Sequence, residues 1–222
     1  QLHGSPGEDG LIQAMLERAD CPYQGADPTG SMLALNKAVS KEIFSQAGLP
    51  TPRWHFLTSV PDGDFKLDFD LPVFVKPNTG GSSLDMSMVL DESLLSTAID
   101  KAFNSADSVL IEEYIQGEEL TCGVLGNTAL PPILIRPAEE SAFFDYHSKY
   151  VPQAAEEICP APIPQELTNE LGRMAVTAHE ALGLRGYSRA DFIVRDGQPW
   201  LLEVNTLPGM TQTSLMPQAA AA

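Results

Sequence analysis

Basic residues and cysteines are scarce in this sequence. It has 13 Lys and Arg against 30 Asp and Glu over 222 residues, which gives a formal net charge of −17. Because nucleic acids and anionic membranes are bound through basic patches, neither is an expected partner. The three cysteines, Cys21, Cys122 and Cys159, are far apart and form no CxxC pair. They indicate neither a disulfide framework nor a zinc site.

Long apolar runs are also missing. No stretch approaches the roughly 18 consecutive apolar residues of a membrane span, and no signal peptide opens the chain. An apolar content of 43% with 19% charged residues is typical of a soluble globular protein, so we expect a cytoplasmic location. The chain begins at Gln1 and ends in QAAAA, which suggests a fragment of a longer protein. Its length allows one or two domains.

What the chain does contain is a charged hairpin near its end, SRADFIVRDGQPWLLEVNTLPGM. The dipeptide Asp196-Gly197 is a turn signal between two apolar runs. A three-residue loop over residues 196–198 would place three pairs opposite one another: Arg195 and Pro199, Asp191 and Glu203, and Arg189 and Asn205.

Alternation along the two strands separates a polar face from an apolar face. The predicted apolar face carries Phe192, Val194, Leu202 and Val204. On the polar face the carboxylates of Asp191 and Glu203, with Cβ atoms roughly 5 Å apart, would repel unless a cation or a proton lay between them. With Asn205 they form an oxygen-rich set that suits Mg²⁺, and Arg189 could bind an anion beside it. The alternative is the solvated outer face of an ordinary hairpin, and the spacing alone does not decide.

The rest of the chain predicts helices and strands without strict βαβ alternation. Helices are predicted over residues 11–18, 31–47, 92–103 and 164–184, and the second of these would contain Lys37. Strands are predicted before Lys76, after the following Gly/Ser loop, on both sides of Gln116-Gly117, and in the hairpin, whereas residues 131–164 are expected to be irregular. This order favours antiparallel or mixed sheets covered by helices, in two α+β lobes.

Two segments are candidates for nucleotide binding. Lys76 precedes PNTGGSS, where glycine amides and the hydroxyls of Ser82 and Ser83 could approach phosphates, although a flexible hairpin tip is the simpler interpretation of that segment alone. The segment IEEYIQGEE offers backbone groups at Glu113 and Ile115 to an adenine edge. Tyr114 would add an apolar wall and Glu119 a carboxylate for the ribose hydroxyls, although a plain strand crossover is again simpler.

Taken together, these segments resemble the D-alanine:D-alanine ligases of the ATP-grasp superfamily. The resemblance is carried by HGSPGEDG, VKPNTGGSSLDMS, IEEYIQGEE, FFDYHSKY, GYSRADFIV and LLEVNTLPGMTQTSL, in this order from about His3 to the C-terminal end. It implies an α+β ATP-grasp fold in which two lobes clamp ATP after the remnant of an N-terminal α/β domain. The implied domains are residues 1–30, 31–115 and 116–222.

The resemblance also implies a reaction. ATP phosphorylates the carboxylate of one D-alanine, and the amine of a second D-alanine attacks the acyl phosphate to form D-alanyl-D-alanine for peptidoglycan synthesis. The implied cofactors are ATP with Mg²⁺ or Mn²⁺, and the full-length protein is expected to be a homodimer. The alternatives are a D-alanine:D-serine or D-lactate ligase, another ATP-grasp carboxylate-amine ligase, or a non-catalytic nucleotide-binding module.

The resemblance assigns nucleotide and metal ligands to positions of this sequence. Lys37 and Lys76 match ligands of the α- and β-phosphates, and Lys149 matches a contact of the γ-phosphate. The nucleoside would be bound by Glu112, Glu113, Tyr114, Ile115 and Glu119. The magnesium ligands would be Asp191, Glu203 and Asn205.

It assigns the amino-acid substrates as well. Arg189 and the backbone N–H of Gly209 match groups that stabilise the developing oxyanion. Ser214, with Leu215, matches the site for the carboxylate of the second D-alanine. The first D-alanine would be oriented through Ser82 and Tyr150, with His3 near that pocket.

The sequence departs from the family pattern in four respects. Leu84-Asp85 interrupts the usual GSSVGMS, Thr213 replaces a common histidine, and Ser188 replaces a common glycine. These departures affect the expected substrate preference and loop closure, whereas Tyr150 favours an amine nucleophile. The fourth is the absence of the first strand-loop, whose glutamate binds the first D-alanine, so we expect this polypeptide alone to be inactive.

Overall fold

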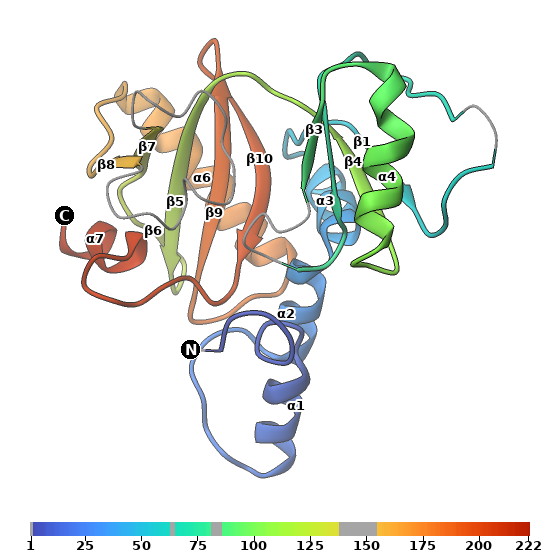
Figure 1. Cartoon of the computed structure of the whole chain (residues 1–222). Coiled ribbons are helices and arrows are strands. Elements are labelled where there is room, and N and C mark those ends of the chain that lie inside the picture. Colours follow the sequence, from blue (N-terminus) through green and yellow to red (C-terminus); the bar gives the residue numbers. More distant parts are fainter. Residues whose placement is uncertain (1, 63–64, 81–85, 138–154) are drawn as a thin grey trace.

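The computed structural model describes residues 2–62, 65–80, 86–137 and 155–222. Within these ranges the strands form two antiparallel sheets that lie side by side in Figure 1. The smaller sheet has four strands in the order β1-β4-β2-β3. The larger sheet has six, in the order β10-β9-β5-β7-β8 with β6 paired to β5. Every helix in these ranges is too short or too polar to traverse a bilayer.

The smaller sheet consists of β1 (Trp54–Leu57), β2 (Val73–Pro77), β3 (Ser87–Val89) and β4 (Val109–Glu113). The short helix η1 (Glu92–Leu94) and helix α4 (Leu95–Phe103) follow β3, and α4 covers one face. Val73, Val75, Ile99 and Ile111 form the centre of its core. The predicted strands on both sides of the Gly/Ser loop and the helix over 92–103 are confirmed, whereas β1 was not predicted.

The larger sheet consists of β5 (Glu118–Leu125), β6 (Thr128–Ala129), β7 (Ile133–Pro137), β8 (Ala155–Ile158), β9 (Tyr187–Arg195) and β10 (Gln198–Asn205). Helix α6 (Gln165–Ala181) buries Leu171, Met174 and Ala178 against it, as its spacing predicts. Strands β7 and β8 show that the expectation of irregular structure over residues 131–164 was wrong there. The flanking prolines and the acidic β8 hid two short strands at the edge of the sheet.

The N-terminal part is helical. Helix α1 (Leu11–Arg18) agrees with the prediction, but the single helix over residues 31–47 is wrong: the chain forms α2 (Pro28–Leu35) and α3 (Lys37–Gln46). Asn36 has extended backbone angles, and its side chain accepts a hydrogen bond from the backbone N–H of Val39, which starts a new helix. Lys37 is therefore the first residue of α3, and Val39, two residues further along this helix, is 38% exposed.

Helices α2 and α3 pack against the larger sheet. Ala34, Phe44 and Leu49 belong to the same core as Leu120 and Phe192. In Figure 1, α3 lies close to both sheets and α1 projects away from them. Because α3 contacts the larger sheet while its first residues bond to the end of β2, it connects the two sheets.

Helix α7 (Leu215–Ala221), which was not predicted, packs against Gly123 of β5, whose neighbours Cys122 and Val124 face α6 on the other side of the larger sheet. A Cβ atom at Gly123 would be 2.5 Å from the sulfur of Met216 in α7. Gly123 pairs with Arg189, so α7 covers one end of the face that carries Arg189.

Candidate functional site

The charged hairpin forms the edge of the larger sheet, and two of its three predicted residue pairs are confirmed. Asp191 lies opposite Glu203, and Arg189 lies opposite Asn205. The predicted three-residue loop was wrong. Asp196 and Gly197 both have positive φ, 54° and 77°, as a two-residue turn requires, so Gln198 pairs with Arg195 and Pro199 pairs with Val194.

A β-bulge between Leu201 and Glu203 reconciles the shorter turn with the predicted pairing. It adds one residue to β10, which shifts the alternation of side chains between the two faces. Leu201 is therefore fully buried in the core, and Leu202 is only half-buried, contrary to the prediction for Leu202. The other members of the predicted apolar face, Phe192, Val194 and Val204, are buried as expected.

Arg189 and Asp191 form a bidentate ion pair on the polar face. Arg189 Nε donates to Asp191 Oδ1 and Nη2 donates to Oδ2, both at 2.8 Å. Burial alone would lower the pKa of Arg189, but the adjacent Asp191 outweighs it and the pKa is raised above its ordinary value. Thr121, which sequence reasoning missed, donates from Oγ1 to Asp191 Oδ1 at 2.7 Å. This carboxylate is therefore held in one orientation from two sides.

Glu203 and Asn205 complete the predicted oxygen set. The Glu203 side chain is 43% exposed, and its Oε2 lies 4.0 Å from Nζ of Lys37. Asn205 Oδ1 accepts a hydrogen bond of 2.9 Å from the backbone N–H of Leu207. In the described ranges no three His, Cys, Asp or Glu side chains gather as a metal centre, but the predicted set uses an amide as its third ligand. Two carboxylates at paired positions with this amide suit a hard divalent cation.

Lys37 reaches this face from α3. Its Nζ donates to the carbonyl oxygen of Gly80 at 2.6 Å, and burial lowers its pKa despite the nearby Glu203. Asn78, also missed from the sequence, fixes this lysine. Its Oδ1 accepts from the backbone N–H of Ala38 at 2.8 Å, its Nδ2 donates to Asn36 Oδ1 at 3.0 Å, and its carbonyl oxygen accepts from the backbone N–H of Lys37 at 3.1 Å. The end of β2 is thereby tied to the start of α3.

Lys76 is paired with a buried carboxylate. Its Nζ donates to Glu112 Oε1 at 2.8 Å, and Nζ of Lys41 lies 2.7 Å from Glu112 Oε2. Burial acts to raise the pKa of Glu112, but the two lysines outweigh it and lower the pKa to about 2. Lys41 was missed because a lysine on a helix is usually solvated. Its spacing of three residues from both Ala38 and Phe44, which are buried, is the signal that places it inward.

The predicted nucleoside segment crosses from the smaller to the larger sheet between β4 and β5 (Figure 1). The Glu113 carboxylate pairs with Arg53, whose Nε lies 3.0 Å from Oε2. Tyr114 packs its ring edge-on against Phe74 at a centroid distance of 5.5 Å, and Ile115 is buried. Glu119 lies on β5, two residues before Thr121, which is paired with Asp191.

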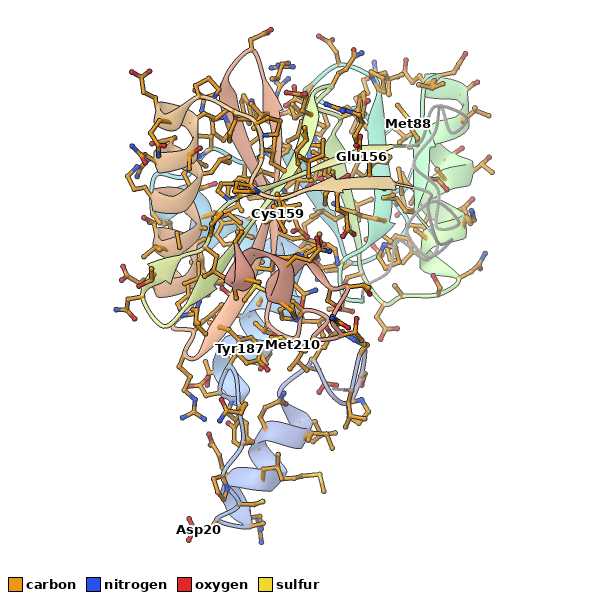
Figure 2. The ribbon with its side chains drawn as sticks, turned by 90° about the vertical axis from the view of Figure 1, so that its left-hand side faces the viewer. Asp20, Met88, Glu156, Cys159, Tyr187 and Met210 are labelled. Atoms are coloured by element: carbon orange, nitrogen blue, oxygen red, sulfur yellow. The ribbon has the colours of Figure 1, made fainter. Side chains whose placement is uncertain are left out.

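Gly209 and Ser214 meet in the loop between β10 and α7, where Figure 2 labels Met210. A Cβ atom at Gly209 would lie 2.7 Å from Ser214 Oγ, so a larger residue would collide with this hydroxyl. Ser214 Oγ accepts from the backbone N–H of Thr211 at 3.1 Å and lies 2.8 Å from Thr211 Oγ1. Thr213 is exposed in the same loop, and Leu215 begins α7.

The remaining predicted residues are not brought to this face or cannot be placed. Ser82, Lys149, Tyr150 and the departure at Leu84-Asp85 lie outside the described residues. Ser188 is fully buried, and its Oγ lies 2.7 Å from Nδ1 of His179. The His3 side chain is 60% exposed, and its Nδ1 lies 3.8 Å from Oε1 of Glu8. A cavity of about 670 Å³ between α6 and the loop after β6 contains none of the predicted site residues.

Comparison with known proteins identifies close relatives. A family model described as the D-ala D-ala ligase C-terminus matches residues 43–222. A D-alanine–D-alanine ligase of Nitratidesulfovibrio vulgaris (strain DP4) is 60% identical over 222 residues, covering 100% of this chain and 73% of that protein.

Solved structures agree with the sequence relatives. The D-alanine–D-alanine ligase from Bacillus anthracis complexed with ATP superposes with a TM-score of 0.85 at 36% identity, covering 99% of this chain and 71% of that one. The VanG D-Ala:D-Ser ligase from Enterococcus faecalis has a TM-score of 0.85 at 33% identity, covering 98% of this chain and 65% of that one.

Proposed function

The chain belongs to the D-alanine–D-alanine ligase family, and on that premise we propose how its own side chains bind ATP and join two D-alanines. It is an ATP-dependent ligase of peptidoglycan synthesis with the predicted α+β ATP-grasp fold. The observation that carries the assignment of the site is the pairing of Asp191 with Glu203, with Arg189 beside them and Lys37 facing them. The division into domains over residues 1–30, 31–115 and 116–222 is part of the proposal.

ATP would lie between the two sheets. Lys37 and Lys76 approach this space from α3 and β2 and would bind the α- and β-phosphates. The crossing segment Glu112–Ile115 would bind the adenine, and Glu119 would accept from the ribose hydroxyls. Lys149, outside the described residues, would contact the γ-phosphate. A Mg²⁺ or Mn²⁺ ion bound by Asp191, Glu203 and Asn205 would supply positive charge beside the terminal phosphates.

The reaction has two steps. A carboxylate oxygen of the first D-alanine attacks the γ-phosphorus, the bond from phosphorus to the bridging oxygen of ADP breaks, and D-alanyl phosphate forms. The amine nitrogen of the second D-alanine then forms the new C–N bond, phosphate leaves with the electrons of the C–O bond, and the nitrogen loses a proton. Negative charge therefore develops first on the phosphoryl group and then on the tetrahedral oxygen.

Arg189 is suited to stabilise this charge. It is held in place by Asp191 through two hydrogen bonds and remains a cation at every physiological pH. The backbone N–H of Gly209 would be the second donor to the tetrahedral oxygen. Ser214, which lies against Gly209, would hold the carboxylate of the second D-alanine. Ser82 and Tyr150, which are not among the described residues, would orient the first D-alanine.

The second substrate separates this proposal from its nearest alternatives, the D-serine and D-lactate ligases. In the intact enzyme with Mg²⁺, ATP and D-alanine, we expect phosphate release and formation of D-alanyl-D-alanine. Turnover that requires D-serine or D-lactate as the second substrate would overturn the assignment to D-alanine. Binding of ATP without any phosphate release would instead indicate a non-catalytic nucleotide-binding module.

Two further properties belong to this proposal. We expect a homodimer, to be measured by light scattering of the intact enzyme, and a cytoplasmic location, to be measured by cell fractionation. A monomeric mass would contradict the first, and recovery with the membrane fraction would contradict the second.

A further inference from the structure

Lys41 is a fully buried lysine for which the proposed reaction has no use. Its side chain is 0% exposed, and its ammonium lies 2.7 Å from Glu112 Oε2. It also donates to Thr51 Oγ1 at 2.6 Å and to the carbonyl oxygen of Pro52 at 3.2 Å. Burying a lysine is costly, so a lysine kept in such a place requires a compensating partner.

The partner, Glu112, is shared with a second lysine. Lys76 Nζ donates to the other carboxylate oxygen, Oε1, at 2.8 Å. The group of three therefore contains two positive charges and one negative charge, an excess of one positive charge. If Lys41 were neutral, Glu112 and Lys76 would form a simple pair without net charge. Lys76 would then offer little attraction to an approaching anion.

The two lysines differ in their freedom to move. Lys41 is fixed by Thr51 and Pro52 on one side and lies 5.5 Å from the centre of the Trp54 ring. The Lys76 side chain is 15% exposed and lies near the end of β2, shortly before the loop that is predicted to contact phosphates. Lys76 is thus the member of the group that can turn toward a ligand, and Lys41 is the one that stays with the carboxylate.

We propose that Lys41 is a positioning residue that neutralises Glu112 permanently, so that the ammonium of Lys76 remains available to the triphosphate of ATP. This inference rests on the proposed ATP site and names a residue that acts through Lys76 rather than by touching the nucleotide.

The protonation states agree with this role. Burial lowers the pKa of Lys41 to about 8 even though Glu112 acts to raise it, so the lysine is still mostly protonated at pH 7. The pKa of Glu112, about 2, leaves its carboxylate ionised. Both charges of the inner pair are therefore present under physiological conditions.

The test compares nucleotides that differ in their phosphates. In the intact enzyme, Lys41→Met removes the charge with little change in shape. We expect its Kd for ATP and for ADP to rise about tenfold, while the Kd for adenosine changes less than about twofold. Lys41→Arg, which keeps the charge, should restore most of the ATP affinity. The matched control is Lys101→Met at an exposed lysine of α4, which should bind all three ligands like the unaltered enzyme.

Equal weakening of ATP and adenosine in Lys41→Met would show that Lys41 is merely structural, and unchanged ATP binding would overturn the inference as well. Should Lys41→Met fail to fold, Lys41→Gln removes the charge while it can still bond to Thr51 and Pro52, and the same comparison applies. Failure of the unaltered enzyme to bind ATP at all would refute the proposed function instead, so the two failures are distinguishable.

Discussion

The hairpin of the larger sheet and the lysine group between α3 and the smaller sheet have opposite charge balances. On the hairpin side the three carboxylates of Asp191, Glu203 and Glu119 outnumber the two cations of Arg189 and Lys37, whereas Lys41 and Lys76 outnumber Glu112 on the other. The hairpin carboxylates are partly exposed, while the lysine group is almost completely buried. An excess of negative charge suits a divalent cation, and an excess of positive charge suits a polyphosphate. The hairpin and the lysine group thus fit complementary halves of the proposed site for a metal nucleotide.

This difference also determines how each half can be tested. The hairpin carboxylates are partly exposed to solvent, where a ligand can reach them. Substitutions there should therefore change catalysis and metal affinity more than the free energy of unfolding. Around α3 and β2, the side chains that position the proposed phosphate ligands also make buried contacts that stabilise the fold. Substitutions there should change both nucleotide affinity and the free energy of unfolding.

The largest effect is expected from Asp191→Asn. The change removes the counter-charge that orients Arg189 and one oxygen ligand of the proposed cation, so kcat for phosphate release should fall about a thousandfold. Asp196→Asn, the same change at the hairpin turn, should leave kcat almost unaltered because asparagine tolerates the positive φ of that position. Similar kcat values for the two variants would remove the hairpin from the catalytic site.

A smaller effect is expected from Thr121→Val. This variant removes the hydroxyl that donates to Asp191 but keeps the shape of the side chain, so the affinity for Mn²⁺ should fall about tenfold or more. Titration with Mn²⁺, followed by electron paramagnetic resonance, measures it directly. Thr121→Ser keeps the hydroxyl and should bind Mn²⁺ nearly normally. If the serine variant were as weak as the valine variant, the hydrogen bond would not be the cause.

On the lysine side, Asn78→Ala should affect stability and nucleotide binding together. It leaves the backbone N–H of Ala38 without its acceptor and removes one of the two donors to Asn36 Oδ1, so the free energy of unfolding should fall by about 1–3 kcal/mol. Because Lys37 loses its anchor, KM for ATP should also rise severalfold. Urea unfolding and steady-state kinetics measure the two changes. Asn104→Ala, at an exposed asparagine, is the control, and a stability loss without any change in KM would contradict the link to Lys37.

The smallest effect concerns the pair His179 and Ser188 in the core behind the hairpin. Burial lowers the pKa of His179 despite Glu180, so the folded state favours the neutral ring. Its stabilising contribution should be complete above the ordinary pKa of 6.5 and should be lost as the pH falls below it. Urea unfolding at several pH values should therefore show the stability difference between the unaltered enzyme and His179→Gln shrinking toward low pH. A difference independent of pH would exclude this titration.

The hairpin was predictable because its information is local. The turn signal and the alternating pattern predicted the two strands, and Asp191 lies opposite Glu203 as predicted because the unpredicted bulge at Leu202 compensates for a turn of two residues instead of three. The division of one expected helix into α2 and α3 was not predicted, because apolar spacing continues across Asn36. The break is revealed only by the hydrogen bonds that Asn36 Oδ1 accepts from the backbone N–H of Val39 and from Asn78 Nδ2.

The lysine group could not be predicted in full because its contacts join distant segments. Lys76 and Glu112 were recognised as candidates. The contact of Glu112 with Lys41 of α3, however, depends on the pairing of β2 with β4 and on the packing of α3. Strands β7 and β8 were missed for a related reason. Each is short, and its pairing partner is far away in the sequence, so neither has a strong local pattern.

The bulge at Leu202 has a consequence for how this hairpin tolerates change. A three-residue turn without the extra residue, and a two-residue turn with it, both bring Asp191 opposite Glu203. A change in the length of the turn can therefore be compensated by a bulge farther along the hairpin, provided that the number of residues between Asp191 and Glu203 stays the same. The hairpin tip could therefore change in length while the pairing of Asp191 with Glu203 is preserved.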